Sequence, residues 1–169
     1  MVELLAPFRV DLRVYDPYLA DEAAARLGIE RADLDAVLRH AEILVVQVPL
    51  TPKTTRLIGA RELDLLGRGK ILINCSRGRV LDQEALIRKL QAGELIAGLD
   101  VFDPEPLERD SPLRALPNVF LSPHIAWYAP NVFYRTFLNT VVEFERFFRG
   151  EPLQYPLTPR MLDIRHGRI

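Results

Sequence analysis

Two short stretches of aliphatic residues decide the fold: residues 43–48 read ILVVQV and residues 70–74 read KILIN. Neither stretch alternates strictly between apolar and polar residues, which is typical of parallel strands that are covered on both faces. Similar runs at 9–15, 96–102 and 119–121 predict three more strands. Segments with helical spacing separate the strands, and they lie at 19–27, 34–40, 60–66 and 83–92. This alternation predicts the α/β class, with a doubly wound, Rossmann-like parallel sheet.

The composition is that of one globular domain. The chain has 169 residues and a net charge of −1, from 22 basic and 23 acidic side chains. Nucleic-acid binding needs a local excess of basic groups, so we expect no nucleic-acid partner. The single cysteine excludes an internal disulfide and a cysteine-based zinc cluster. No apolar run approaches the roughly 20 residues that span a bilayer, so we expect a cytoplasmic protein without a membrane partner.

Both ends of the chain depart from a standard dinucleotide-binding fold. Residues 1–8 (MVELLAPF) have helical character and precede the first expected strand. Such a fold normally opens with a strand and a G-x-G-x-x-G turn that binds the cofactor pyrophosphate. We therefore expect residues 1–150 to form a partial dinucleotide-binding domain that lacks the first strand and the glycine-rich turn. Residues 151–169 are rich in proline, and we expect an extended C-terminal tail there.

A helix is expected at 131–149, with Gly150 directly after its last turn. Its apolar face is wider than a surface helix needs. The aromatic residues on it are Phe133, Tyr134, Phe137, Phe144, Phe147 and Phe148. Such a helix is either buried under another part of the chain or packed on a second subunit.

Charged side chains follow the expected strands, at the edge where parallel sheets bind their ligands. Asp16 stands where a carboxylate accepts hydrogen bonds from an adenosine ribose. Arg77 follows the KILIN strand, and its planar guanidinium suits bidentate binding of a carboxylate. Asp100 and Glu105 follow the next strand, and a carboxylate beside His124 would form a general acid–base pair. Each residue has an ordinary explanation as a turn or surface residue, so the prediction of a site depends on their sharing one edge.

Three other chemically distinctive residues are expected to be structural. His40 ends an expected helix, and His166 lies in the tail. No neighbour in the sequence would lower the pKa of Cys75, so we expect a small buried side chain there instead of a nucleophile.

Four stretches carry a resemblance to a known family. They are 41–58 (AEILVVQVPLTPKTTRLI), 69–82 (GKILINCSRGRVLD), 97–107 (AGLDVFDPEPL) and 122–127 (SPHIAW). Together they resemble the NAD-binding domain of the D-isomer-specific 2-hydroxyacid dehydrogenases, over roughly residues 1–150. The Trp127-Tyr128 pair is similar to the branch of this family that contains the C-terminal-binding-protein co-repressors.

The resemblance implies an NAD cofactor. Asp16 would hold the adenosine ribose and favour NAD over NADP, and Asp100 would face the nicotinamide carboxamide. The other implied contacts are Val48, Pro49 and Thr54 on the adenine and ribose side, and Cys75, Ser76, Arg77 and His124 on the nicotinamide side.

The resemblance also implies an oxidoreductase that acts on the CH–OH group of a D-2-hydroxy acid. Arg77 would bind the 2-oxo acid, His124 would donate a proton to its carbonyl group, and Glu105 would orient His124. Members of the family dimerise through this domain, which implies a homodimer that uses the helix at 131–149. They also have a substrate domain that this chain lacks, so a non-catalytic NAD(H)-binding or dimerisation module is the alternative function.

Overall fold

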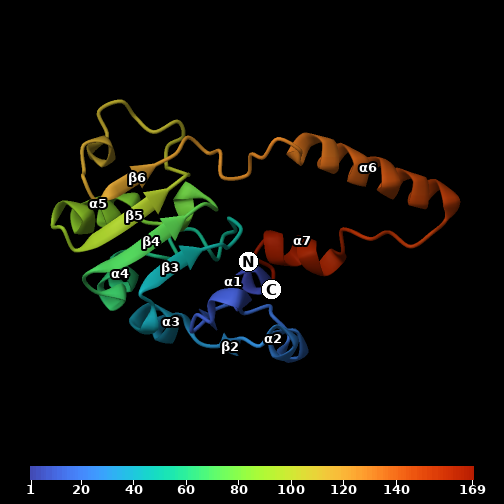
Figure 1. The fold of residues 1–169 in the computed structure, drawn as a ribbon, viewed down its shortest axis with the longest axis horizontal. Coiled ribbons are helices and arrows are strands. Elements are labelled where there is room, and N and C mark those ends of the chain that lie inside the picture. Colours follow the sequence, from blue (N-terminus) through green and yellow to red (C-terminus); the bar gives the residue numbers. More distant parts are fainter.

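The computed structural model describes residues 1–169, and its centre is a four-stranded sheet in the order β3-β4-β5-β6 (Figure 1). The strands are Ile43–Val46 (β3), Lys70–Asn74 (β4), Leu95–Leu99 (β5) and Val119–Leu121 (β6). All three neighbouring pairs are parallel. The carboxyl ends of the strands therefore lie along one edge of the sheet. The predicted α/β class and parallel sheet are confirmed.

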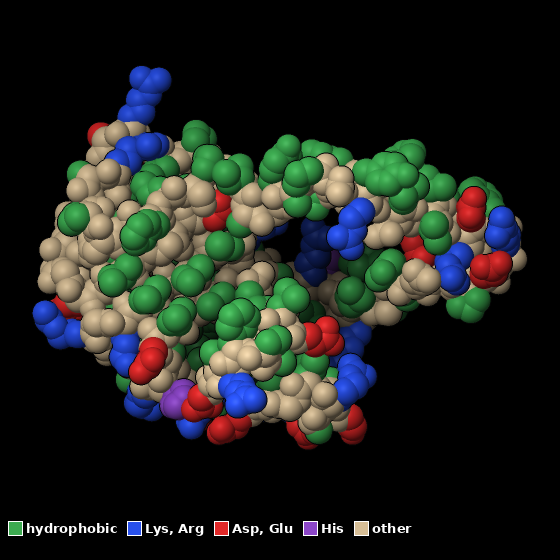
Figure 2. All heavy atoms as spheres, viewed as in Figure 1, with side chains coloured by type: hydrophobic (Ala, Val, Ile, Leu, Met, Phe, Trp, Pro, Cys, Tyr) green, Lys and Arg blue, Asp and Glu red, His purple; other side chains and the backbone are tan.

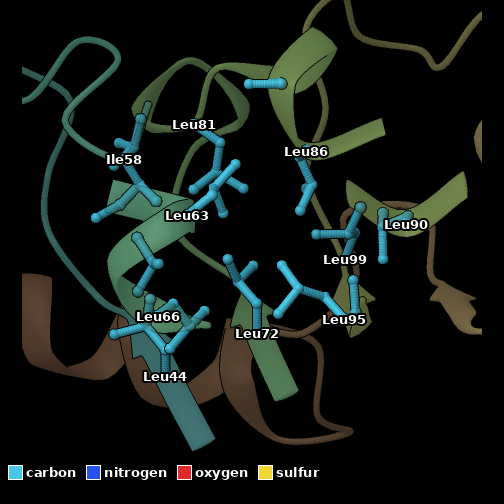
Figure 3. Close-up of a cluster of buried hydrophobic side chains, with 14 of the residues drawn as sticks. Leu44, Ile58, Leu63, Leu66, Leu72, Leu81, Leu86, Leu90, Leu95 and Leu99 are labelled. Atoms are coloured by element: carbon cyan, nitrogen blue, oxygen red, sulfur yellow. The ribbon is translucent and has the colours of Figure 1, made fainter. Parts of the chain in front are cut away.

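The connecting helices form the layer that closes the core. They are α3 (Leu34–His40), α4 (Ala60–Leu66) and α5 (Gln83–Gln91). Leu63 and Leu86 from this layer are buried in one cluster with Leu72 and Leu99 of the sheet (Figure 3). The Asp33 and Asp82 carboxylates accept hydrogen bonds from backbone N–H groups in the first turns of α3 and α5. These N-caps explain why both helices begin where the sequence predicts.

The opposite face of the sheet is open to solvent. In β3, Leu44 and Val46 are buried, whereas Ile43 is 55% and Val45 is 37% exposed. Phe120 of β6 lies on the same open face as Val45, because the register joins them through Ile73 and Gly98, and it is 69% exposed. The expectation that β3 is covered on both faces is therefore wrong for this chain. The core lies on the side of α3, α4 and α5, and no other element buries the second face.

The N-terminal part forms a separate, two-stranded parallel sheet. After α1 (Val2–Leu5) and a 3-10 turn, η1 (Ala6–Phe8), the chain makes β1 (Arg13–Val14), α2 (Asp21–Leu27) and β2 (Glu30–Arg31). The strand expected at 9–15 is thus reduced to two residues. β1 pairs only with β2, and a strand extends no further than its partner supplies hydrogen bonds. The helical character predicted for residues 1–8 is confirmed.

Helix α6 (Val132–Arg149) projects away from the body of the molecule, and none of its residues is buried (Figure 1). Hydrophobic side chains gather along it in Figure 2, and Phe137, Phe147 and Phe148 are all more than half exposed. Gly150 adopts the left-handed conformation that ends the helix, as the sequence predicts. No helix of the chain combines the length and apolar character needed to cross a membrane.

The C-terminal residues are not wholly extended, which corrects the expectation for 151–169. Residues Pro159–Arg165 form helix α7, because Thr158 caps its first turn and proline is favourable at the first helical position. Both oxygens of Glu143 accept backbone N–H groups of Gln154 and Tyr155, so the chain turns back along α6. At the end of the chain, the Tyr18 hydroxyl donates to the carbonyl oxygen of Ile169.

Candidate active site

The centre of the candidate site is a pair formed by His124 and Glu105. His124 Nδ1 lies 3.1 Å from Glu105 Oε2. The other carboxylate oxygen, Oε1, accepts a hydrogen bond of 3.1 Å from the backbone N–H of Phe102, which fixes the direction of Glu105. The side chains are 40% and 37% exposed. His124 Nε2 has no partner within the chain, so the imidazole can exchange a proton with a bound molecule on that side.

The backbone around His124 is unusual and strongly held. Its φ angle is +54°, in the left-handed region that residues with a Cβ adopt rarely. The His124 N–H donates to the carbonyl oxygen of Asp100 at 2.9 Å. The indole Nε1 of Trp127 donates to the carbonyl oxygen of His124 at 2.8 Å. Both backbone polar groups of His124 are therefore used to hold the turn.

Asp100 is buried, at 2% exposure, directly after β5. Its carboxylate accepts hydrogen bonds from Ser122 Oγ (2.5 Å), Ile125 N (2.9 Å) and Ala126 N (2.9 Å). Burial by itself raises the pKa of Asp100, but these three hydrogen bonds and the charge of His124 outweigh burial, and the pKa is lower than usual. The charged form of Asp100 is therefore stabilised by donors from the segment that carries His124.

Arg77 lies on the neighbouring loop, after β4. It is exposed and forms no ion pair with any carboxylate of the chain, and its side chain makes one hydrogen bond, from Nη1 to the carbonyl oxygen of Ser76. The buried Asn74 shapes this turn, since its Nδ2 donates to the Arg77 carbonyl oxygen and its Oδ1 accepts from the Ser76 N–H and hydroxyl. The remaining N–H groups of Arg77 are available to an anionic ligand.

Gly78 brings the Arg77 loop against the Glu105 loop. A Cβ atom placed on Gly78 would lie 1.9 Å from the carbonyl oxygen of Phe102, so only glycine permits this approach. On the far side of the loop, the Gln83 amide donates to the Asp103 carbonyl oxygen and accepts from the Asp103 N–H. The loops that carry Arg77, Glu105 and His124 are thus joined to one another by close contacts.

Cys75 and Ser76 do not have the character of reactive groups. Cys75 is exposed as a residue, which corrects the expectation of a buried side chain, because it directly follows β4 at the open edge of the sheet. Desolvation of the thiol, together with the negative charge of Asp100, raises the pKa of Cys75. Ser76 is buried and its hydroxyl donates to Asn74.

The residues predicted for the adenosine side lie on two separate segments. Asp16 follows β1, and its Oδ1 accepts from the Tyr18 N–H, whereas its Oδ2 has no partner in the chain. Thr54 closes a turn, because its hydroxyl donates to the Pro49 carbonyl oxygen and accepts from the Thr51 N–H. No hydrogen bond joins Asp16 to this turn. Val48 packs against the hydrophobic core.

Several residues that position the site were not predicted from the sequence. Asn74, Gly78, Gln83 and Ser122 support the three loops through the contacts described above. Their proximity in sequence to Arg77 and His124 was the only available signal. Asn74 binds Ser76 and Arg77 in its own turn, whereas the partners of the other three lie 20–24 residues away in the sequence.

The parallel sheet presents an acid–base pair and an arginine without an ion pair at its carboxyl edge, where open α/β sheets bind their ligands. The family described as "D-isomer specific 2-hydroxyacid dehydrogenase, NAD binding domain" matches residues 1–126. The chain belongs to this family.

Known relatives agree with this assignment. The chain is 37% identical over 126 residues to the D-3-phosphoglycerate dehydrogenase of Methanocaldococcus jannaschii, a match that covers 73% of this chain and 24% of that relative. It is 48% identical over 106 residues to the glyoxylate/hydroxypyruvate reductase B of Erwinia tasmaniensis, covering 62% of this chain and 33% of that one.

A solved structure with a similar sequence has the same fold as this chain. The NAD-complexed D-isomer specific 2-hydroxyacid dehydrogenase of Lactobacillus delbrueckii ssp. bulgaricus superposes with a TM-score of 0.80 and 26% identity, over 93% of this chain and 51% of that chain. This chain therefore spans about a quarter to a third of the length of these two relatives and about half of this solved structure.

Proposed function

We propose that this chain supplies the NAD-binding domain and the acid–base groups of a dehydrogenase that interconverts a 2-oxo acid and a D-2-hydroxy acid. The observation that carries the proposal is the His124–Glu105 pair, with its Nδ1–Oε2 distance of 3.1 Å and a free Nε2. Family membership supports NAD as the cofactor. The names of the relatives support a small 2-oxo or 2-hydroxy acid as the substrate.

The roles of the three catalytic residues follow from their chemistry. Arg77 binds the carboxylate of the 2-oxo acid through the N–H groups that no protein acceptor uses. His124 donates a proton from Nε2 to the carbonyl oxygen as that oxygen gains negative charge. Glu105 holds the tautomer and the direction of His124 through Nδ1, and its charge stabilises the imidazolium. The reduced cofactor, NADH, would supply the hydride for the reduction and leave as NAD+.

The residues present fit part of a dinucleotide site. Asp16 keeps one carboxylate oxygen free, as binding of a ribose hydroxyl requires, and its charge opposes a 2′-phosphate. Val48, Pro49 and Thr54 would line the adenine and ribose side, and Cys75, Ser76 and Asp100 the nicotinamide side. The 169 residues contain no G-x-G-x-x-G sequence, so the pyrophosphate would lack its usual backbone N–H partners in this chain.

Calorimetric titration of NADH into the 169-residue chain tests the cofactor site directly. We expect saturable binding that Asp16→Ala weakens at least tenfold, whereas Asp110→Ala, a change at an exposed carboxylate without a partner, leaves it unchanged. NADPH should bind more weakly than NADH, and Asp16→Ala should reduce that difference. Equal affinity of the wild-type and Asp16→Ala chains would contradict the assignment of Asp16.

A non-catalytic NAD(H)-binding or dimerisation module is the second candidate function, and α6 is the observation that favours it. At about 100° per residue, its aromatic side chains fall on one side of the helix, with Arg135, Asn139 and Arg146 on the other. The aromatic side is exposed along its whole length. We propose that it forms a symmetric homodimer interface, and that the protein acts in the cytoplasm.

Sedimentation velocity tests whether α6 forms a dimer interface, because it distinguishes a dimer from a monomer. We expect a wild-type dimer that Phe137→Glu combined with Phe144→Glu converts to a monomer, while Asn139→Glu on the polar side keeps the dimer. A double variant that stays dimeric would contradict an interface on this face. A dimer without any 2-oxo acid reduction would support the non-catalytic module.

A further inference from the structure

We propose that Asp100 is a positioning residue for His124: its buried carboxylate fixes the loop that presents the imidazole to Glu105. The inference rests on the proposed function, because it concerns how the proton donor of that site is held. It gives Asp100 a role within the protein, in addition to the implied contact with the nicotinamide carboxamide.

The contacts of Asp100 enclose His124 from both sides. Ser122 precedes the histidine by two residues, and its hydroxyl donates to Oδ1. Ile125 and Ala126 follow it directly, and their N–H groups donate to Oδ1 and Oδ2. The Asp100 backbone adds a fourth contact, since its carbonyl oxygen accepts the His124 N–H. One buried residue therefore holds four of the five residues from 122 to 126.

The left-handed backbone conformation of His124 depends on the carboxylate of Asp100. Because φ of His124 is +54°, the N–H groups of Ile125 and Ala126 point toward the same carboxylate. Successive backbone N–H groups that converge on one anion in this way form a backbone nest. A residue with a Cβ does not favour this conformation, so it persists where surrounding contacts impose it. The carboxylate of Asp100 is the acceptor that makes the convergence of the Ile125 and Ala126 N–H groups favourable.

The site requires a charged acceptor at position 100. All three side-chain contacts of Asp100 come from donors, namely one hydroxyl and two backbone N–H groups. A carboxylate accepts from every one of them, whereas an amide of the same size would direct its own N–H groups at a donor. The lowered pKa of Asp100 agrees with this arrangement, because the charged form is the one the loop stabilises.

Amide hydrogen exchange by NMR tests the proposal without substrate or cofactor. In Asp100→Asn we expect the Ile125 and Ala126 amides and the Trp127 indole N–H to exchange at least tenfold faster, while the amides of β4 keep their rates. Asp103→Asn is the matched control, because that side chain pairs with Arg79 and not with the loop. It should leave all of these rates unchanged.

Two results would overturn the proposal. Unchanged exchange at Ile125 and Ala126 would mean that Asp100 does not hold the loop. Equal acceleration of the loop and of β4 would mean that Asp100 stabilises the whole fold and does not act on the loop in particular. Neither result depends on whether the protein reduces 2-oxo acids, so the proposed function is judged separately.

If Asp100→Asn does not fold, an NMR pH titration of the wild-type chain tests the proposal instead. Lowering the pH should move the Ile125 and Ala126 amide proton resonances upfield together, with one midpoint below the ordinary aspartate pKa of about 3.9. Resonances of these two amides that do not titrate together would overturn the proposal.

Discussion

Gly78 touches the backbone of Phe102 so closely that a Cβ atom on the glycine would lie 1.9 Å from the phenylalanine carbonyl oxygen. This contact joins the loop that carries Arg77 to the loop that carries Glu105. Because both partners are main-chain atoms, neither can rotate away as a side chain would. The relative position of Arg77 and the His124–Glu105 pair therefore depends on the absence of a side chain at residue 78.

Gly78→Ala should destabilise the protein by about 1–3 kcal/mol or more, as expected for an inserted methyl group that the surroundings cannot accommodate. Urea unfolding measures this loss. Gly98→Ala is the matched control, because a Cβ there would meet only the Ile73 side chain, at 3.9 Å. It should change the free energy of unfolding much less. Equal effects of the two substitutions would contradict the tight contact at Gly78.

Asp100 should make the stability of the protein depend on pH with a defined sign. The pKa of its carboxyl is lowered in the folded state, so its contribution is fully present above the unfolded value of about 3.9 and is lost as the pH falls through the folded value. The difference in unfolding free energy between wild type and Asp100→Asn should be largest near about pH 6 and shrink toward about pH 3. A difference that is constant over this range would contradict the charged anchor.

Cys75 should react slowly with alkylating reagents at neutral pH, although the residue is exposed. Desolvation and the charge of Asp100 raise the pKa of the thiol, and only the thiolate is nucleophilic. The rate of iodoacetamide modification should still rise above about pH 8.5, where an ordinary thiol is half ionised.

N-acetylcysteine provides the reference for this measurement. Asp100→Asn should move the midpoint of the Cys75 reaction to lower pH, because it removes the neighbouring negative charge. A midpoint below that of N-acetylcysteine would show an activated thiol and contradict the structural role.

His124→Gln and Glu105→Gln should separate the two members of the acid–base pair. In an assay of 2-oxo acid reduction by the protein, loss of the proton donor should lower kcat by roughly 10²–10⁴-fold. Glu105→Gln retains a hydrogen-bonding side chain but removes its charge, so the loss should be smaller. Lys53→Gln, at an exposed residue outside the pair, is the control. Full activity of His124→Gln would contradict its role as proton donor.

Much of the fold was predictable from local sequence because its causes are local. The apolar run at Lys70–Asn74 and the helices Leu34–His40 and Ala60–Leu66 have the predicted bounds. Asp33 and Asp82 cap α3 and α5 through the backbone three residues ahead. Local patterns of this kind specify secondary structure through residues only a few positions apart.

The exposure of the sheet could not be predicted in the same way. The sequence of β3 has apolar residues on both sides, yet Ile43 and Val45 on one side are exposed. An apolar side chain shows that a face can be buried, but the neighbouring elements decide whether it is. The same holds for the aromatic side of α6, which lies outside the core of this chain.

The sequence by itself determined the alternating α/β architecture, the bounds of its central elements and the set of charged residues at the strand ends, because spacing and capping act over a few residues. Only the tertiary structure decided that His124 Nδ1 lies 3.1 Å from Glu105 Oε2, that Gly78 must lie against Phe102, and that Asp100 holds the loop from 122 to 126. These contacts join residues 19–26 positions apart. The parallel sheet brings their loops together at one edge, and no pattern along the chain specifies which donor will meet which acceptor there.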